Sequence, residues 1–310
     1  MKITFVPVFL CVLCFHSCVI TALNNRPIIG VVAQEMYNRP NYSYIAASYV
    51  KFVEGSGARV VPVLINQDDE YYEYIVKHVN GILLPGGGTY FNVTGGFADA
   101  GVKLYQLALE MNKKGDYFPI WGTCLGFELL TYAAADRVEH RLRCEHYNEA
   151  VPLDFLEDAT TSRMFGNISW DLMKILMNED VTANFHHFCL TKKNMTELGL
   201  AEDWRFMTFN HDKNDLEYIS TLEHKHYPFY GVQFHPEKNN YEWKEGKNHP
   251  HNANGVRTSQ YFANFFVNEA RKNHHEFPSE EEEKKYLIYN HPAINTSKQS
   301  FFMQIYVFEQ

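Results

Sequence analysis

The chain has 310 residues, and its 28 basic and 37 acidic side chains give a net charge of −9 with histidine neutral. Apolar residues make up 45 % and aromatic residues 15 % of it, which indicates a folded globular protein rather than a disordered one. Basic residues form nothing longer than short lysine pairs, so the composition argues against nucleic acid as a partner.

The N-terminus has the pattern of a secretory signal peptide. Lys2 precedes an apolar run over residues 3–20, and small or polar residues such as Ala22 and Asn24 follow it. A membrane anchor is the alternative, but the run barely reaches the ~18 to 20 residues that span a bilayer, and no charge cluster follows it directly. We therefore predict that residues 1–23 are removed and that the mature, secreted chain has no membrane anchor.

Signal removal leaves an odd number of cysteines. Three of the six leave with residues 1–23, and three remain: Cys124, Cys144 and Cys189. In an oxidising compartment at least one thiol of the monomer is then unpaired, unless chains are cross-linked, so it must be buried or used. The sequence leaves open whether Cys144 and Cys189 pair.

Five glycosylation sequons agree with secretion, since so many are harder to attribute to chance than one or two. Their acceptor residues are Asn41, Asn92, Asn167, Asn194 and Asn295. The sequence thus predicts a glycoprotein.

The mature chain is predicted to be a single domain over residues 24–310. Its roughly 285 residues lie at the upper end of the single-domain range, and neither an internal repeat nor a Pro/Gly-rich linker divides it. A charged run at 279–285 is expected to be a solvated linker. The apolar stretches 286–289 and 301–308 are expected to be short strands, which makes 279–310 a C-terminal appendage.

Alternating elements in the first half predict an α/β fold. Short apolar runs predict buried strands, and helical spacing predicts helices between them. This order favours a mostly parallel central sheet with helices on both faces. The expected strands are 27–33, 59–64, 81–85 and 117–121, and the expected helices are 45–53, 69–79, 98–114 and 127–135. Aromatic stretches at 204–210, 216–221 and 229–234 are expected to extend the sheet with antiparallel strands.

The end of the fourth expected strand carries the segment Gly-Thr-Cys-Leu-Gly, residues 122–126. Glycines on both sides of Cys124 allow a tight strand-to-helix turn. A thiol at a helix N-terminus is stabilised as thiolate, so we expect a lowered pKa for Cys124. The N–H of Leu125 can point at an oxyanion. A buried structural cysteine beside packing glycines is the alternative.

Two further motifs support a nucleophile. Gly86 and Gly87 follow the third strand, at the same carboxyl edge of the sheet, where their N–H groups could complete an oxyanion hole. His235 and Glu237 follow an apolar strand and flank Pro236, which suits a general base with an orienting carboxylate. Alone, the glycines could form only a flexible loop, and the histidine could be a surface residue. Together the motifs predict a Cys124–His235–Glu237 triad.

The three motifs resemble those of class I glutamine amidotransferases over roughly residues 26–272. The chain differs from those glutaminase subunits in its signal peptide, its sequons, its lack of a synthetase domain and Glu128, where Gln is common in that family. This combination, with the stretches Tyr44–Val50 and Ala183–His186, the acidic run and the terminal sequon, is similar to the γ-glutamyl hydrolase family.

The resemblance implies hydrolysis of γ-glutamyl bonds in folate and antifolate poly-γ-glutamates through a Cys124 acyl-enzyme. It implies no cofactor, a homodimer, and a lysosomal as well as a secreted location. We also expect no metal site, since His249 and His251 lie close in sequence without further ligands.

Four residues are predicted to bind the substrate. Tyr49 and His186 lie in stretches shared with the family. Glu128 lies one helical turn after the nucleophile and could accept an amide N–H. Lys238 could face a substrate carboxylate, although a lysine after a strand is often only solvated. Two other functions stay open: a secreted glutaminase, and a catalytically inactive binding protein.

Overall fold

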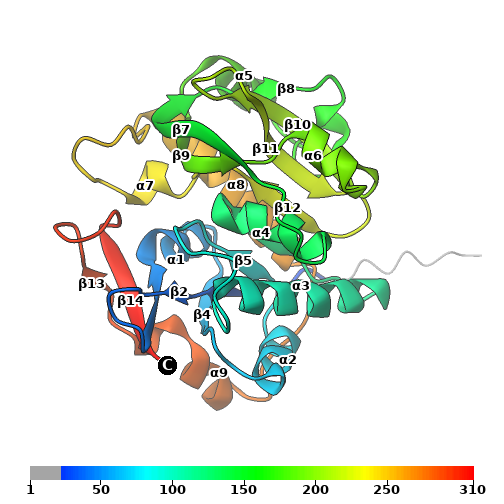
Figure 1. The fold of residues 1–310 in the computed structure, drawn as a ribbon. Coiled ribbons are helices and arrows are strands. Elements are labelled where there is room, and N and C mark those ends of the chain that lie inside the picture. The colour runs from blue at the N-terminus through cyan, green and yellow to red at the C-terminus, as the bar shows by residue number, and fades with distance from the viewer. Residues whose placement is uncertain (1–21) are drawn as a thin grey trace, which may run out of the picture.

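In a computed structural model that describes residues 22–310, a central sheet of eight strands runs through the molecule (Figure 1). Five neighbouring strands are parallel, and three antiparallel strands extend one edge. In spatial order they are β4 (Arg59–Val63), β1 (Ile28–Val32), β5 (Ile82–Leu84), β6 (Ile120–Thr123), β12 (Phe229–Val232), β11 (Glu217–His224), β10 (Trp204–His211) and β8 (Asp154–Phe155). This sheet confirms the predicted α/β class and the antiparallel extension.

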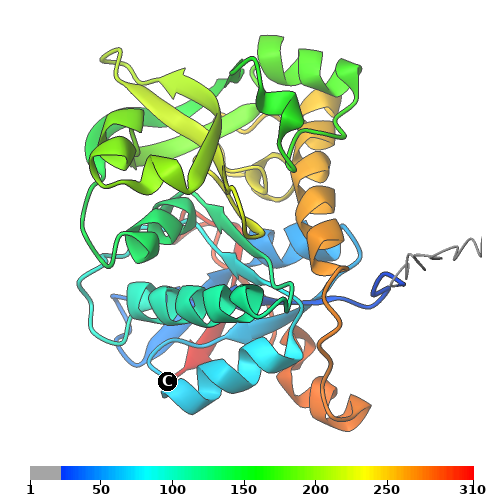
Figure 2. The same cartoon turned by 90° about the vertical axis from the view of Figure 1, so that its right-hand side faces the viewer.

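Helices cover both faces of the sheet because its central strands are apolar on both sides. Along β1, Ile28 and Val32 pack into one core, whereas Ile29 and Val31 pack into the other. The first core includes α2 (Asp69–His78), α3 (Phe97–Lys113) and α4 (Leu125–Ala134), and the second includes α1 (Ala47–Glu54), α5 (Trp170–Asn178) and α8 (Ala253–Ala270). Figure 2 shows α8 (orange) and α3 (teal) on opposite sides of the molecule.

Polar side chains define where several helices begin. The Asp68 side chain accepts a hydrogen bond from the N–H of Tyr71 and caps α2, and Asn252 caps α8 through the N–H of Gly255. The α3 N-terminus is capped from another element, since the Glu35 carboxylate accepts from the N–H of Phe97 at 2.9 Å. The shorter helices are α6 (Lys192–Glu197), α7 (Lys238–Tyr241), α9 (Glu280–Tyr286), and the 3-10 turns Ala159–Thr161, Leu200–Glu202 and Ile288–Asn290.

Two smaller sheets flank the central one. β7 (Leu142–Val151) and β9 (Thr182–Cys189) form an antiparallel pair. β13 (Ile294–Asn295) and β14 (Gln304–Glu309) join β3 (Tyr42–Ala46) and β2 (Gln34–Glu35), with β14 antiparallel to β3. The end of the chain therefore pairs with a strand near its beginning (Figure 1).

Three sequence-based expectations differ from the structure. The stretch 286–289 is not a strand, since it joins the end of α9 to a 3-10 turn. The charged run 279–285 folds into α9, because Ser279 accepts from the N–H of Glu282 and four glutamates occupy the first turn. The helix expected at 45–53 begins at Ala47, because Tyr42–Ala46 forms β3.

The predicted signal peptide lies almost entirely outside the described residues. Within residues 22–310, none of the helices has the length and apolar character that a membrane span requires.

Candidate active site

Cys124 occupies the turn between β6 and α4, as the glycine pattern predicts. Its backbone has φ +51° and ψ −109°, a conformation that L-residues rarely adopt and that marks a strained turn. The flanking glycines allow close packing, since a Cβ on Gly122 would lie 2.5 Å from the carbonyl oxygen of Gly126. A Cβ on Gly126 would in turn collide with the carbonyl group of Leu84 in β5. The thiol is thus presented at the carboxyl edge of the sheet.

His235 and Glu237 form the predicted pair. The Nδ1–H of His235 donates to Oε1 of Glu237 at 2.8 Å, and both side chains are buried. This bond leaves Nε2 of His235 as the free base. A Cβ on Gly86 would lie 2.6 Å from Cε1 of His235 and 3.0 Å from Cβ of Cys124, so Gly86 lies between the nucleophile and the base.

Tyr49 contacts both the base and the backbone of Gly86. Its hydroxyl oxygen lies 3.2 Å from Nδ1 of His235 and accepts the N–H of Gly86 at 2.9 Å. The Gly86 N–H is therefore already used, which leaves Gly87 and Leu125 as the predicted oxyanion donors. A Cβ on Gly87 would collide with Oε1 of Gln34, so a side chain there would require the end of the Gln34 side chain to move.

Burial sets the resting protonation states of the triad. Burial raises the pKa of the Cys124 thiol, the charge of Glu128 raises it further, and the N–H of Leu125 opposes both. Burial lowers the pKa of His235, against the opposing effect of Glu237. The resting pair is therefore a thiol and a neutral imidazole. This raised pKa is opposite in direction to the lowered pKa that a helix N-terminus alone predicts for Cys124, and burial is its largest cause.

Glu128 is buried behind the nucleophile. Its carboxylate accepts from the Arg141 guanidinium at 3.0 Å and from Nε2 of Gln233 at 3.1 Å. Burial raises the pKa of Glu128 to about 7, although Arg141 and Gln233 oppose the change. Glu128 does not line the large cavity beside His235. It acts on the site through its charge, which raises the pKa of Cys124.

A cavity of about 810 Å³ opens next to His235 and Gly87. Three cationic side chains, Arg39, Lys238 and Lys247, line it, whereas Glu35 is its one carboxylate among the described residues. The β7–β9 pair contributes Tyr147, Phe185 and His187 to the lining, and the C-terminal segment contributes eight residues between Ile294 and Val307. The segment predicted to be an appendage thus forms a wall of the cavity.

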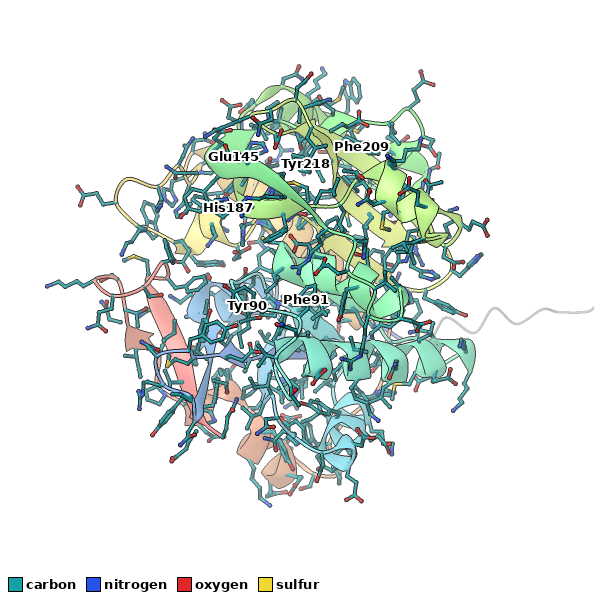
Figure 3. The ribbon with its side chains drawn as sticks, in the orientation of Figure 1. Tyr90, Phe91, Glu145, His187, Phe209 and Tyr218 are labelled. Atoms are coloured by element: carbon teal, nitrogen blue, oxygen red, sulfur yellow. A yellow bond between two sulfur atoms is a disulfide. The ribbon has the colours of Figure 1, made fainter. Side chains whose placement is uncertain are left out.

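His186 lies away from this cavity. Its Nδ1 is 3.6 Å from Sγ of Cys144 and 3.5 Å from Sγ of Cys189, and its Nε2 contacts Oδ1 of Asn184. Because side chains alternate along β9, the neighbouring His187 lines the cavity instead. Figure 3 labels His187 on the β7–β9 ribbon. The structure therefore does not bring His186 to this cavity, and His187 takes the place there that the sequence assigned to its neighbour.

Cys144 and Cys189 form a disulfide, which leaves Cys124 as the free cysteine of the described chain. Together with His186 they are the one cluster in residues 22–310 with metal-ligand spacing. Because both sulfurs are bonded to each other, the cluster lacks the thiolates that a metal would need.

The predicted glycosylation sites differ in accessibility. Four acceptor asparagines are exposed: Asn41, Asn92, Asn167 and Asn295. Asn194 is half-buried, and its amide nitrogen donates to the carbonyl oxygen of His140 at 2.6 Å.

Known proteins similar in sequence identify the family of this chain. Residues 27–237 match the peptidase C26 family. The gamma-glutamyl hydrolase of Rattus norvegicus is 43 % identical over 291 residues, which cover 92 % of this chain and 90 % of that protein. The gamma-glutamyl hydrolase of Homo sapiens is 44 % identical over 289 residues, with coverage of 92 % and 90 %. A solved structure of a glutamine amido transferase from Methylobacillus flagellatus has a TM-score of 0.48 at 10 % identity, covering 81 % of this chain and 96 % of that one. On the two sequence matches and the family match, the chain belongs to the γ-glutamyl hydrolase family of cysteine peptidases, peptidase C26.

Proposed function

We propose that this protein hydrolyses γ-glutamyl amide bonds in folate and antifolate poly-γ-glutamates. The observation that carries the proposal is the cavity beside His235, which has three cationic side chains and one carboxylate in a chain of net charge −9. A chain of γ-linked glutamates carries one free α-carboxylate per residue, so it is a polyanion. A cation-lined cavity in an acidic protein attracts such a substrate selectively.

The triad geometry supports a general-base mechanism. Sγ of Cys124 attacks the γ-carbonyl carbon while its proton moves to Nε2 of His235. Glu237 holds the imidazole through Nδ1 and stabilises its positive charge. The carbonyl oxygen then becomes negative, and we assign its stabilisation to the N–H groups of Gly87 and Leu125.

The tetrahedral intermediate collapses when the C–N bond breaks and His235 returns its proton to the leaving amine. This step leaves a thioester on Cys124. Water then attacks the thioester, gives its proton to His235, and releases the acyl group as a carboxylate with the thiol restored.

Lys238 is the cation nearest to this chemistry in the sequence, and it lines the cavity. Its ammonium group has no carboxylate within 4 Å in the described part of the chain, so it is available to a ligand. We assign it to the α-carboxylate of a glutamate beside the scissile bond. We still propose that Glu128 contributes to the preference against glutamine. It would do so through its own charge near Cys124 and not by accepting a substrate amide N–H.

The cellular setting is proposed from the sequence. A signal peptide at 1–23, the disulfide and four exposed sequon asparagines support a secreted and lysosomal glycoprotein. A homodimer is proposed from the family resemblance.

The proposal is tested by incubating purified protein with a γ-glutamyl dipeptide, its α-linked isomer and free glutamine. The expected result is release of glutamate from the γ-linked compound only, and no release by Cys124→Ala. Faster ammonia release from glutamine would favour a glutaminase and would overturn the substrate assignment. Absence of any reaction, with no selective alkylation of Cys124, would favour an inactive binding protein.

A further inference from the structure

Two lysines in the cavity are held in the same way, each between two aromatic rings. Nζ of Lys238 lies 5.6 Å from the ring of Phe185 and 4.9 Å from that of Phe302. Nζ of Lys247 lies 4.8 Å from the ring of Tyr147 and 5.7 Å from that of Phe301. In both cases one ring comes from the β7–β9 pair and the other from the C-terminal segment.

The two lysines lie at different depths from the triad. Lys238 is buried, directly follows Glu237, and its charge lowers the pKa values of Cys124 and His235. Lys247 is half-buried in the loop between α7 and α8 and has no such effect on either group. The rings of Phe185 and Tyr147 are 5.4 Å apart, so the inner and outer positions are neighbours along one wall.

Neither ammonium group forms an ion pair within 4 Å in the described chain, although the charges of Glu237 and Glu242 act on Lys238 from farther away. The described chain pairs many exposed lysines with carboxylates, as in Lys193 with Glu197. In residues 22–310, Lys238 and Lys247 have no carboxylate within 4 Å, and the one polar side-chain contact of Lys247 is its hydrogen bond to the hydroxyl of Tyr147 at 3.2 Å. In a chain with more acidic than basic residues, two unpaired cations in one cavity indicate an anionic ligand.

A poly-γ-glutamate has matching chemistry. Successive α-carbons are five bonds apart, so the α-carboxylates of an extended chain repeat about every 6 Å. The rings of Phe185 and Tyr147, against which the two lysines lie, have centroids 5.4 Å apart, which is of the same order as this repeat. The aromatic faces keep both lysines in place through cation–π contacts, so little side-chain freedom is lost when a carboxylate binds.

Building on the proposed function, we propose that Lys247 binds the α-carboxylate of the γ-glutamyl residue that lies one position farther from the scissile bond than the one held by Lys238. Lys247 is then a specificity residue that favours longer γ-glutamyl chains, and the C-terminal segment supports it through Phe301. Lys244 fixes that segment to the same loop, since its ammonium group donates to the carbonyl oxygens of Ser297 and Ser300.

The test compares kcat/KM for a γ-linked tetraglutamate with that for a γ-linked diglutamate. We expect Lys247→Met to reduce the preference for the longer chain by about tenfold, the loss of one charge-assisted contact, and Lys247→Arg to restore most of it. Lys193→Met, an exposed charge on α6, is the matched control and should leave the preference unchanged. The wild-type preference should also fall with added salt, and more steeply than that of Lys247→Met.

The outcomes separate this inference from the proposed function. If Lys247 only links the loop to the C-terminal segment, Lys247→Met changes both substrates equally and the inference is overturned. If the wild-type protein shows no preference for the tetraglutamate, the inference is also overturned while the proposed function stands. If the wild-type protein cleaves neither substrate, the proposed function itself fails.

Discussion

Replacing Glu128 by glutamine is expected to stabilise the protein above neutral pH and to have no such effect in acid. Burial raises the pKa of Glu128 from 4.5 to about 7, so the folded state holds this proton more tightly than the unfolded state. Ionised Glu128 therefore penalises folding. The loss of folding free energy that ionised Glu128 causes is about 3 kcal/mol; it is absent below pH 4.5 and complete above pH 7.

Glutamine mimics the protonated carboxyl group and can keep both neighbours. Its oxygen can accept from Arg141, and its amide can donate to Gln233, whose Oε1 is buried without a partner. The free energy of unfolding should thus be about 3 kcal/mol higher in the variant than in the wild type at pH 8, and equal at pH 4.5. Urea titrations at pH 4.5, 6 and 8 measure the difference.

Glu139→Gln is the matched control because Glu139 binds the same Arg141 side chain from a half-exposed position. Although burial opposes it, the hydrogen bonds of Arg141 lower the pKa of Glu139, so this variant should lose stability at high pH instead. A Glu128→Gln effect that is the same at all three pH values would refute the burial argument. The charge of Glu128 raises the pKa of Cys124, so Glu128→Gln should lower it. The limb of the kcat/KM profile that reports the Cys124 thiol should therefore move to lower pH.

Three further changes test the site and the disulfide. Cys124→Ala should abolish turnover with an unchanged circular dichroism spectrum, whereas Gly86→Ala should lower kcat by at least a hundredfold because its Cβ would lie 2.6 Å from His235. Burial lowers the pKa of His235, so the base stays neutral in mild acid, and kcat/KM should persist below pH 6.5 in a pH–rate profile. Replacing Cys144 and Cys189 by serine should lower the free energy of unfolding by about 4 kcal/mol, because the bond closes a loop with a separation of 45 residues.

Much of the fold could be predicted from local pattern. The buried runs that became β1, β4, β5 and β6 are apolar on both faces, which only a covered parallel sheet explains. The site followed from the same logic, because the residues after β5, β6 and β12 meet at one edge of the sheet.

The remaining features depend on contacts between distant segments. The cavity wall from residues 294–307 exists because β14 pairs with β3, and nothing in the local sequence specifies that pairing. The choice between His186 and His187 depends on which face of β9 meets the disulfide, so a shift of one residue exchanges their roles. The neutral state of Cys124 depends on desolvation by elements far apart in the sequence, whereas its position at a helix N-terminus is a local feature.

The electrostatics of the triad and of the cavity are connected through Lys238. Its positive charge favours the thiolate of Cys124 but disfavours the protonated form of His235, so in the empty site it opposes the charge that the base must accept. A bound α-carboxylate would offset that charge and raise the pKa of His235, strengthening the base when a substrate is present. Free glutamine carries an α-ammonium group beside its carboxylate, so it would offset less charge than an internal residue of a poly-γ-glutamate, whose nitrogen is an amide. The same lysine can therefore contribute to binding, to base strength and to the preference for γ-glutamyl chains.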